Sequence, residues 1–347
     1  MRKPSLLRRG TAVACLALAT AAATAAEASY SIVERWKTGG AGGWDYLSVD
    51  PTGKRLFVSR GDRVEVLDTK SGAALGRIAN TQGVHGIAFA PDLKRGYTSN
   101  GRANSVTEFD LDSLATLREV AVPGVNPDAI VYEPASKRVL TFNGRSKNAT
   151  VLDAATLTVV ATLPMPDKPE FAAVDGKGKV FVNIESDPGR MLVIDAAKAA
   201  VVANWPLPGC DSPTGLALDV QRQRLFSVCD GNIMTVTDAG DGRQVARVAI
   251  GKGPDAAAVD PVRGLVFSSN GEGTLTIVRA EANDHYTVAS TLQTQRGART
   301  MALDPASGRV FLVTAEFGPP PAPTTEQPNP RPVPVPDTFT VLVAAPR

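Results

Sequence analysis

The strongest constraint on the fold is a repeat of about 42 residues that runs through most of the 347-residue chain. A turn follows the first strand of each repeat and recurs at intervals of 40, 43, 42, 44, 41 and 44 residues. These seven turns lie at Asp50, Ala90, Glu133, Asp175, Asp219, Asp260 and Asp304. A second marker, an aspartate after the third strand, occurs at Asp68, Asp110, Asp153, Asp195 and Asp238. A third marker, a proline before the first strand, occurs at Pro127, Pro169, Pro213 and Pro254. Because three markers share one period, the chain is predicted to consist of equivalent structural units.

Each unit reads as four short strands separated by turn residues. In the first copy the predicted strands are Asp45–Val49, Arg55–Ser59, Arg63–Leu67 and Ala74–Ala79. Turn signals about every ten residues favour an all-β protein. A unit of 40–45 residues with four strands is typical of a β-propeller blade. Seven units therefore predict an all-β, seven-bladed β-propeller with four-stranded blades.

The two ends of the chain predict how the ring closes. The seventh repeat ends near Val343 without a fourth strand, whereas Tyr30–Lys37 is a strand without a blade. We expect Tyr30–Lys37 to become the outermost strand of blade seven, within a single propeller domain of residues 27–347. The segment Gly318–Pro336, with nine prolines in 19 residues, interrupts blade seven between its second and third strands. Such a segment favours an extended polyproline conformation, and we expect it to cover the mouth of the ring in part.

Residues 1–26 have the pattern of a cleaved signal peptide, with a basic start, a short apolar core and small residues at the cleavage site. Its four basic residues, Arg2, Lys3, Arg8 and Arg9, account for the whole-chain charge of +2. The remaining chain has 33 basic and 35 acidic residues, a formal charge of −2. The leader predicts a periplasmic or secreted protein with no membrane span, and the charge ranks nucleic acid last among its partners. In an oxidising compartment the two remaining cysteines, Cys210 and Cys229, are predicted to form a disulfide.

One polar residue per blade is predicted to line the mouth of the central channel. These residues lie five positions before each turn marker: Asp45, His85, Asp128, Glu170, Thr214, Asp255 and Arg299. The positions two residues further on are apolar, and side chains alternate along a strand, so this set faces away from the core. A second set, Asn100, Asn143 and Asn270, stands in Asn-Gly pairs after the second strands of three blades. Asn-Gly is first a turn signal, but these amides are also candidates for ligand contacts.

Three interpretations of the carboxylate-rich ring remain open. It is the water-filled polar lining of a channel, a binding site for a small-molecule or protein ligand, or a divalent cation site. Gathered carboxylates suit a hard cation such as Ca²⁺ or Mg²⁺, and the expected ligands are then Asp45, Asp128 and Glu170. No phosphate-binding glycine loop, nucleophile elbow or helical zinc motif occurs in the sequence.

Several repeats resemble the YVTN-repeat, or YncE-like, β-propeller family. The likeness is clearest at Arg-Leu-Phe-Val-Ser from Arg55 with Val-Glu-Val-Leu-Asp-Thr from Val64, at Lys-Val-Phe-Val-Asn from Lys179, and at Arg-Leu-Phe-Ser-Val from Arg224. It extends over nearly all of the chain after the leader. The resemblance implies seven blades and export, and it leaves the chemistry open. Some relatives are reported to bind nucleic acid, and the more distant lactonase propellers hydrolyse cyclic esters, some with a metal.

Three functions follow from these observations, in order of preference. The first is a monomeric, non-catalytic binding or scaffold protein of the cell envelope with a polar site at the channel mouth. The second is a metal-dependent hydrolase of lactone type, in which a carboxylate or His85 activates water. The third is single-stranded nucleic-acid binding, which needs a basic groove with stacking aromatic residues. Only 5% of the residues are aromatic.

Overall fold

The computed structural model describes residues 29–324, 328, 330 and 332–347. The predicted signal peptide, residues 1–26, lies outside the described residues. Among the residues described, no helix has the length and apolarity needed to cross a membrane.

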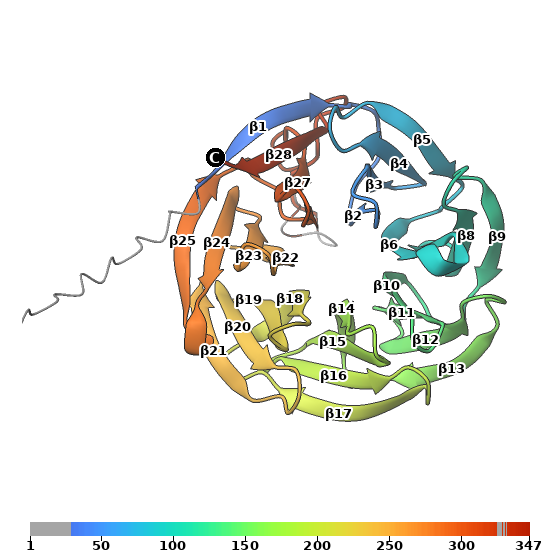
Figure 1. The fold of residues 1–347 in the computed structure, drawn as a ribbon. Helices are drawn as coiled ribbons and strands as arrows, with labels where there is room; N and C mark the ends of the chain where they lie inside the picture. The colour runs from blue at the N-terminus through green and yellow to red at the C-terminus, as the bar shows by residue number, and fades with distance from the viewer. Residues whose placement is uncertain (1–28, 325–327, 329, 331) are drawn as a thin grey trace, which may run out of the picture.

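Seven four-stranded antiparallel sheets surround a central axis, so the predicted seven-bladed β-propeller is confirmed (Figure 1). Each sheet runs from an innermost strand at the axis to an outermost strand at the rim. Blades one to three comprise β2 (Leu47–Val49), β3 (Arg55–Arg60), β4 (Arg63–Asp68) and β5 (Ala74–Ala79); β6 (Val84–Ala90), β7 (Arg95–Asn100), β8 (Ser105–Asp110) and β9 (Thr116–Ala121); and β10 (Pro127–Glu133), β11 (Arg138–Asn143), β12 (Asn148–Asp153) and β13 (Val159–Pro164). Blades four and five comprise β14 (Lys168–Val174), β15 (Lys179–Glu185), β16 (Arg190–Asp195) and β17 (Ala200–Pro206); and β18 (Asp211–Asp219), β19 (Arg224–Asp230), β20 (Ile233–Asp238) and β21 (Gln244–Ala249). Blades six and seven comprise β22 (Pro254–Asp260), β23 (Leu265–Asn270), β24 (Thr274–Ala280) and β25 (Tyr286–Gln293); and β26 (Met301–Asp304), β27 (Arg309–Thr314), β28 (Thr340–Pro346) and β1 (Tyr30–Lys37).

Blade seven joins the two ends of the chain, as predicted. Its strand order is β1-β28-β27-β26, and β1 pairs antiparallel with β28 from Tyr30 opposite Pro346 to Lys37 opposite Thr340. The two strands lie side by side at the rim (Figure 1). The Tyr30 hydroxyl donates a 3.0 Å hydrogen bond to the carbonyl of Gly308, which fixes the start of β1 to the turn between β26 and β27. A ring closed in this way leaves only short edges at the rim, one on the outermost strand of each blade.

The predicted innermost strand of blade one, Asp45–Val49, is too long by two residues. β2 begins at Leu47, because the amide of Asp45 donates to the Ser59 hydroxyl at 3.0 Å and not to a strand carbonyl. The outermost strand of that blade, Ala74–Ala79, is as predicted.

The hydrophobic core lies between blades, and each blade contributes a large apolar side chain from its second strand. These fully buried rings include Phe57, Tyr97, Phe142, Phe181, Phe226, Phe267 and Phe311. The core clusters each extend over neighbouring blades, for example from Leu140 in blade three to Val182 in blade four. Because one blade alone cannot bury both of its faces, the stability of each sheet depends on its two neighbours.

The aspartates that mark the repeat stabilise its turns. Asp219, which is almost completely buried, accepts hydrogen bonds from the amides of Gln221 and Arg222, both at 2.9 Å. Asp260 holds the equivalent turn of blade six through the amides of Val262 and Arg263. The period of the sequence therefore reflects a local need for carboxylates at these turns.

Candidate functional site

The ring residues sit in irregularities at the start of the innermost strands. In blades two to six the strand register shifts near the start of the innermost strand, for example between Pro127 and Ile130 in β10 and between Pro254 and Ala256 in β22. Each shift encloses one ring residue: His85, Asp128, Glu170, Thr214 or Asp255. A bulge re-aims the side chain it carries, and these bulges turn one polar side chain per blade towards the channel mouth.

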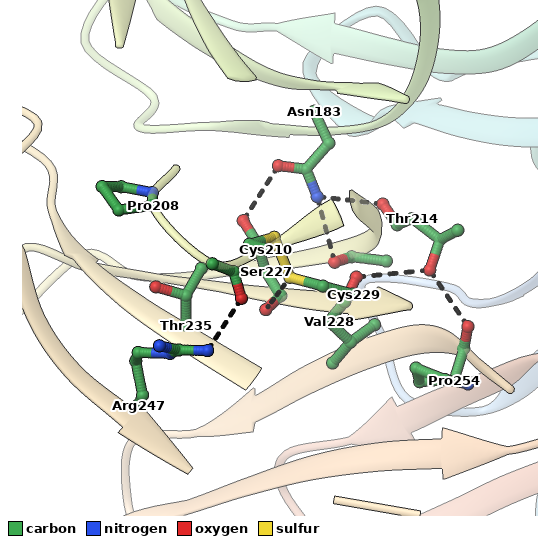
Figure 2. Close-up of a disulfide and its surroundings, with 12 residues drawn as sticks. Asn183, Pro208, Cys210, Thr214, Ser227, Val228, Cys229, Thr235, Arg247 and Pro254 are labelled. Atoms are coloured by element: carbon green, nitrogen blue, oxygen red, sulfur yellow. Dashed lines mark hydrogen bonds between the residues drawn. A yellow bond between two sulfur atoms is a disulfide. The ribbon is translucent and has the colours of Figure 1, made fainter. Parts of the chain in front are cut away.

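Hydrogen bonds between neighbouring blades hold the bulges in place. The Ser99 hydroxyl accepts from the amide of Gly86 at 2.9 Å and donates to the carbonyl of Asp128 in the next blade. The Asn183 side chain donates to the carbonyl of Thr214 at 3.0 Å and accepts from the Ser227 hydroxyl at 2.9 Å (Figure 2). These serines and asparagines satisfy backbone groups that the irregular strands leave unpaired.

Three ring residues form one compact cluster. Nδ1 of His85 lies 2.5 Å from a carboxylate oxygen of Asp45 and 3.7 Å from one of Asp128. One potential metal-ligating atom from each residue lies within 4.8 Å of the other two. Asp45 and His85 are each 27% exposed at the side chain and Asp128 is 13% exposed, so the cluster is accessible from the mouth yet mostly shielded from solvent.

Of the three predicted metal ligands, Asp45 and Asp128 belong to this cluster together with His85, whereas Glu170 lies outside it. Glu170 is held elsewhere by Lys168, which precedes it by two residues on β14. The Lys168 ammonium also contacts the Glu185 carboxylate at 2.6 Å. Lys168, Glu170 and Glu185 thus form a separate, internally paired group beside the cluster.

The remaining ring residues are also paired. Arg299 lies with its Nε 3.3 Å from a carboxylate oxygen of Asp255. The Thr214 hydroxyl donates to the carbonyl of Pro254 at 3.1 Å and therefore links two blades (Figure 2). The structure brings six charged or ionisable ring residues to one mouth, in three groups, and gives the seventh a structural contact.

Two aromatic rings from opposite sides of the propeller meet beneath these groups. Tyr46, beside β2 of blade one, stacks on Phe171 in β14 of blade four, with ring centroids 4.5 Å apart. Phe171 also packs against the core clusters of blades four and five and of blades six and seven. The Tyr46 hydroxyl is buried and lies beside Asp128, where hydrogen bonding to that carboxyl acts to lower its pKa. This hydroxyl is the polar group on the otherwise apolar surface that the two rings form, the Tyr46–Phe171 floor.

The shielded environment shifts several pKa values. Burial raises the pKa of Asp128 to about 6, with the Asp45 charge adding to the shift and His85 opposing it. Burial also raises the pKa of Asp255 to about 6, against the attraction of Arg299. Burial alone lowers the pKa of His85, but its hydrogen bond to Asp45 and the charge of Asp128 outweigh this and raise it. The mouth therefore contains groups that exchange protons near neutral pH, which is typical of binding and catalytic sites.

Four carboxylates lie close enough to Tyr46 to raise the pKa of its hydroxyl. Burial is the largest cause of its increase, followed by the charges of Asp128, Glu170, Asp45 and Asp255. Burial and the Asp128 charge likewise raise the pKa of Glu170, so this carboxyl favours its neutral form. A group that binds here is surrounded by negative charge and by hydrogen-bond donors at once.

The three asparagines proposed as ligand contacts do not reach the mouth. Asn100, Asn143 and Asn270 are fully buried within their own blades. Each side-chain amide donates two hydrogen bonds to oxygens on the adjacent strand, as Asn100 does to Ser105 at 3.0 Å and Thr107 at 2.8 Å. These asparagines stabilise the turn between two strands. Because their side chains are paired within the blade, we exclude them from the candidate site.

The predicted disulfide between Cys210 and Cys229 is confirmed. Cys210 precedes β18 and Cys229 lies in β19, with Cα atoms 5.2 Å apart and both side chains fully buried (Figure 2). It ties the entrance of the innermost strand of blade five to the neighbouring strand, close to Thr214. Such a bond is typical of proteins in oxidising compartments.

The mouth is hollowed by two adjoining cavities that share Gly43, Trp44 and Asp45. The first, of about 400 Å³, contains Asp45 and His85 and is rimmed by Arg102 and Arg145. The second, of about 450 Å³, lies on the side of blade seven. Pro332 and Pro334 of the proline-rich segment line this second cavity, so the described part of that segment does border the mouth.

Sequence reasoning missed Tyr46 and Lys168. Tyr46 stands one residue after the ring position, where the other blades carry Gly86, Ala129, Phe171, Gly215, Ala256 and Thr300. The two large aromatic residues among small ones at this position are the signal that an aromatic pair fills the axis. Lys168 has no comparable signal in the sequence, because its role depends on its ion pair with Glu170, two residues further along β14.

The fold and the mouth together define a seven-bladed β-propeller with a polar cavity at one end of its axis. The chain matches no family model, and no curated protein is detectably similar in sequence. Among solved structures it is similar to the hydrazine synthase of Kuenenia stuttgartiensis, with a TM-score of 0.67 and 18% identity over 78% of this chain and 92% of the other. It is also similar to U3-55K, with a TM-score of 0.71 and 11% identity over 90% and 98% of the two chains. The WD40 repeats of RRP9 give a TM-score of 0.71 and 11% identity over 92% and 97%. At these identities the comparisons show the propeller fold alone.

Proposed function

We propose that this chain is a ligand-binding propeller whose channel mouth holds a divalent metal ion between Asp45, His85 and Asp128. The observation that carries the proposal is the convergence of these three side chains, from three blades, within 4.8 Å of one another. Each lies at or just before the start of an innermost strand, and the Ser99 hydroxyl links the backbone beside His85 to the carbonyl of Asp128 in the next blade. A bound cation would offset the carboxylate charge that otherwise gathers over the Tyr46–Phe171 floor.

The donor set favours a transition metal over the Ca²⁺ or Mg²⁺ first expected. Ca²⁺ and Mg²⁺ prefer all-oxygen coordination, whereas an imidazole with carboxylates suits Zn²⁺ or Mn²⁺. Three protein ligands leave a position for water or for an oxygen of the ligand. The metal would thus fix a polar ligand that enters from the cavity.

The test is calorimetric titration of EDTA-treated protein with Zn²⁺ and Mn²⁺. We expect one site per chain, with an affinity at least tenfold weaker in Asp128→Asn. Glu185→Gln is the matched control, because it removes a nearby carboxylate outside the cluster and leaves binding within about twofold. No saturable site in the parent protein, or equal losses in both variants, would show that the ring is only a polar channel lining.

A metal-dependent hydrolase of lactone type is a second candidate, favoured by the buried hydroxyl of Tyr46 beside the cluster. A buried hydroxyl aimed at a reacting carbonyl stabilises the negative charge that develops on its oxygen, which is worth about 10²-fold in kcat or more. A γ- and δ-lactone panel with and without Zn²⁺ tests this function. Metal-dependent turnover that falls about 10²-fold in Tyr46→Phe supports it, and turnover unchanged by that substitution contradicts the role of Tyr46.

We propose further that the protein is exported, acts in the cell envelope and belongs with the YVTN-repeat, YncE-like propellers. The leader of residues 1–26, the repeat motifs and the buried disulfide support this assignment. N-terminal sequencing of the mature protein from a periplasmic or secreted fraction tests it, with cleavage expected after Ala25 or Ala26. An N-terminus at Met1 in that fraction would contradict the signal-peptide assignment.

A further inference from the structure

The second cavity of the mouth has a chemistry unlike that of the acidic cluster. Its described lining combines two arginines, Arg296 and Arg299, with the aromatic side chains of Trp44 and Phe317 and with Pro332 and Pro334. Trp44 and Asp45 line both cavities, so they lie between the second cavity and the first, which contains His85. At about 450 Å³ the cavity has the size of a typical small-molecule site.

The two arginines can receive an anion. Arg296 is exposed at the mouth and forms no ion pair with any residue that the structure describes. Arg299 uses its Nε towards Asp255 at 3.3 Å, and its side chain remains 49% exposed. A guanidinium group has five donors in a planar fork that matches a carboxylate or phosphate. The cavity thus offers two forks, one of them without an internal counter-ion.

A buried hydroxyl in the same lining also lacks a partner. Thr300 is only 3% exposed, lines the cavity, and its hydroxyl has no hydrogen-bond partner in the described chain. An unpartnered buried hydroxyl costs on the order of 1–3 kcal/mol, and such groups in folded proteins usually have a partner. A ligand oxygen held between the two arginines would provide that partner.

The aromatic part of the cavity lining, Trp44 and Phe317, is itself packed against other residues. The rings of Trp44 and Phe317 lie 6.2 Å apart, and Trp44 also packs on Phe339 at 5.2 Å. An isolated backbone bridge pairs Phe317 with Pro334, so the proline-rich segment is fixed at the point where it borders the cavity. Aromatic and proline surfaces offer apolar contact to a flat organic ring.

We infer that this cavity binds a small aryl carboxylate, or a closely related flat organic anion. Its carboxylate lies between Arg296 and Arg299 with one oxygen at the Thr300 hydroxyl, and its ring lies against Trp44 and Phe317. The inference rests on the proposed function in one respect, since it names the ligand class for the mouth beside the metal cluster. The second cavity and the cluster of Asp45, His85 and Asp128 would then contact two different parts of the same ligand.

The test measures binding of benzoate and 2-naphthoate to the full-length mature protein by calorimetry, with benzamide and 2-naphthamide as neutral counterparts. We expect each carboxylate to bind at least tenfold more tightly than its amide, and 2-naphthoate to bind more tightly than benzoate. Arg296→Gln should weaken naphthoate binding about tenfold, and Thr300→Val about fivefold, while Thr300→Ser retains it. Arg102→Gln is the matched control, because it removes an exposed arginine from the other cavity and should leave the affinity unchanged.

The outcomes separate this inference from the proposed metal site. Equal binding of acids and amides, no measurable binding, or equal losses in Arg102→Gln and Arg296→Gln would overturn the inference. If Thr300→Val keeps full affinity and only raises the melting temperature, the hydroxyl has no ligand role, and that part of the inference fails. Naphthoate binding that persists in a protein unable to bind Zn²⁺ would contradict the proposed metal site alone. Zn²⁺ binding without naphthoate binding would contradict the ligand class alone.

Discussion

Arg224 joins two blades through ion pairs with carboxylates from both. Its Nε and Nη2 contact the two oxygens of Asp284 in blade six at 2.7 and 2.8 Å, and its Nη1 contacts Asp238 in blade five at 2.8 Å. The two-pronged contact to Asp284 is the strongest geometry for such a pair. Hydrogen bonding to Arg224 is the main cause that holds the pKa of Asp284 below its usual value.

The lowered pKa of Asp284 predicts how stability depends on pH. A carboxyl whose pKa is lower in the folded state stabilises the fold above its unfolded pKa, about 3.9, and this contribution is lost as the pH falls through the folded value. We expect Asp284→Asn to reduce the free energy of unfolding by about 1 kcal/mol at pH 7, a figure discounted for partial exposure. The difference should shrink towards zero below pH 3. Urea unfolding at pH 7, 5 and 3 measures it.

Asp112→Asn is the control for this effect. Asp112 is 75% exposed and lies 3.7 Å from the equally exposed Lys94, so its loss should change stability by only a few tenths of a kcal/mol. A deficit in Asp284→Asn that stays constant from pH 7 to pH 3 would contradict the assignment to charge.

At the scale of elements, neighbouring blades meet through close contacts that the repeat pattern does not reveal. Trp205 on β17 packs directly over Gly242 in the turn before β21, and Trp36 on β1 packs over Gly72 before β5. A Cβ at Gly242 would lie 2.3 Å from the Trp205 ring, and the backbone there has a φ of +79°. Only glycine fits both the conformation and the space.

Gly242→Ala is therefore expected to be more damaging than backbone strain alone. Strain at a positive φ costs on the order of 1 kcal/mol, and the displaced tryptophan should raise the total to about 3 kcal/mol. Gly231→Ala provides the comparison, because Gly231 has a φ of +85° in the same blade with open space around its Cβ position. Urea unfolding of both variants checks this prediction, and equal losses would refute the packing contribution.

The disulfide of blade five is expected to contribute to stability through its loop. Cys210 and Cys229 are 19 residues apart, and a closed loop of that length is worth about 3 kcal/mol in the chain-entropy model. The double variant Cys210→Ser, Cys229→Ser should lose about this amount in denaturant unfolding without reductant. The parent protein should lose it on adding dithiothreitol, whereas the double variant should not respond. If reductant breaks the disulfide of the parent protein and its free energy of unfolding does not change, the expected contribution of about 3 kcal/mol is contradicted.

The sequence was sufficient for the blades and insufficient for the pairing of side chains at the mouth. The Asp and Pro markers describe local turns, so they predicted seven sheets, the closing strand and the loop that carries Cys210. They placed Asp45, His85 and Asp128 at equivalent positions of three blades, and these three side chains do lie together. They could not show that Lys168 holds Glu170, or that Asn100 turns inward, because these outcomes depend on side-chain distances between bulged strands.

At the scale of the whole molecule, β1 makes the ring a single closed unit. It supplies the fourth strand of blade seven, and its residues Tyr30 and Ile32 pack in the core shared by blades six and seven. Because every blade depends on two neighbours, an opening at blade seven weakens the packing of the entire ring.

Deletion of residues 27–37 should therefore destabilise the whole propeller and not blade seven alone. We expect a melting temperature at least 10 °C lower, or a chain that does not remain soluble, since the deletion exposes the edge of β28. Replacing Pro319–Pro330 with a short Gly-Ser linker is the control and should shift the melting temperature by only a few degrees, because loop length alters stability weakly. Circular dichroism melts of the three proteins decide, and a truncated protein that melts like the parent would refute the closure argument.

The stacked rings of Tyr46 and Phe171 affect how a ligand enters and leaves the central channel. Because the two rings meet across the axis, we infer that they block the channel beneath the charged groups. A ligand at the mouth would then leave by the opening through which it came, past Trp44 and the arginines that line the two cavities. Entry of a second molecule therefore has to wait for departure of the first, and the residence time of the occupant sets the rate of exchange.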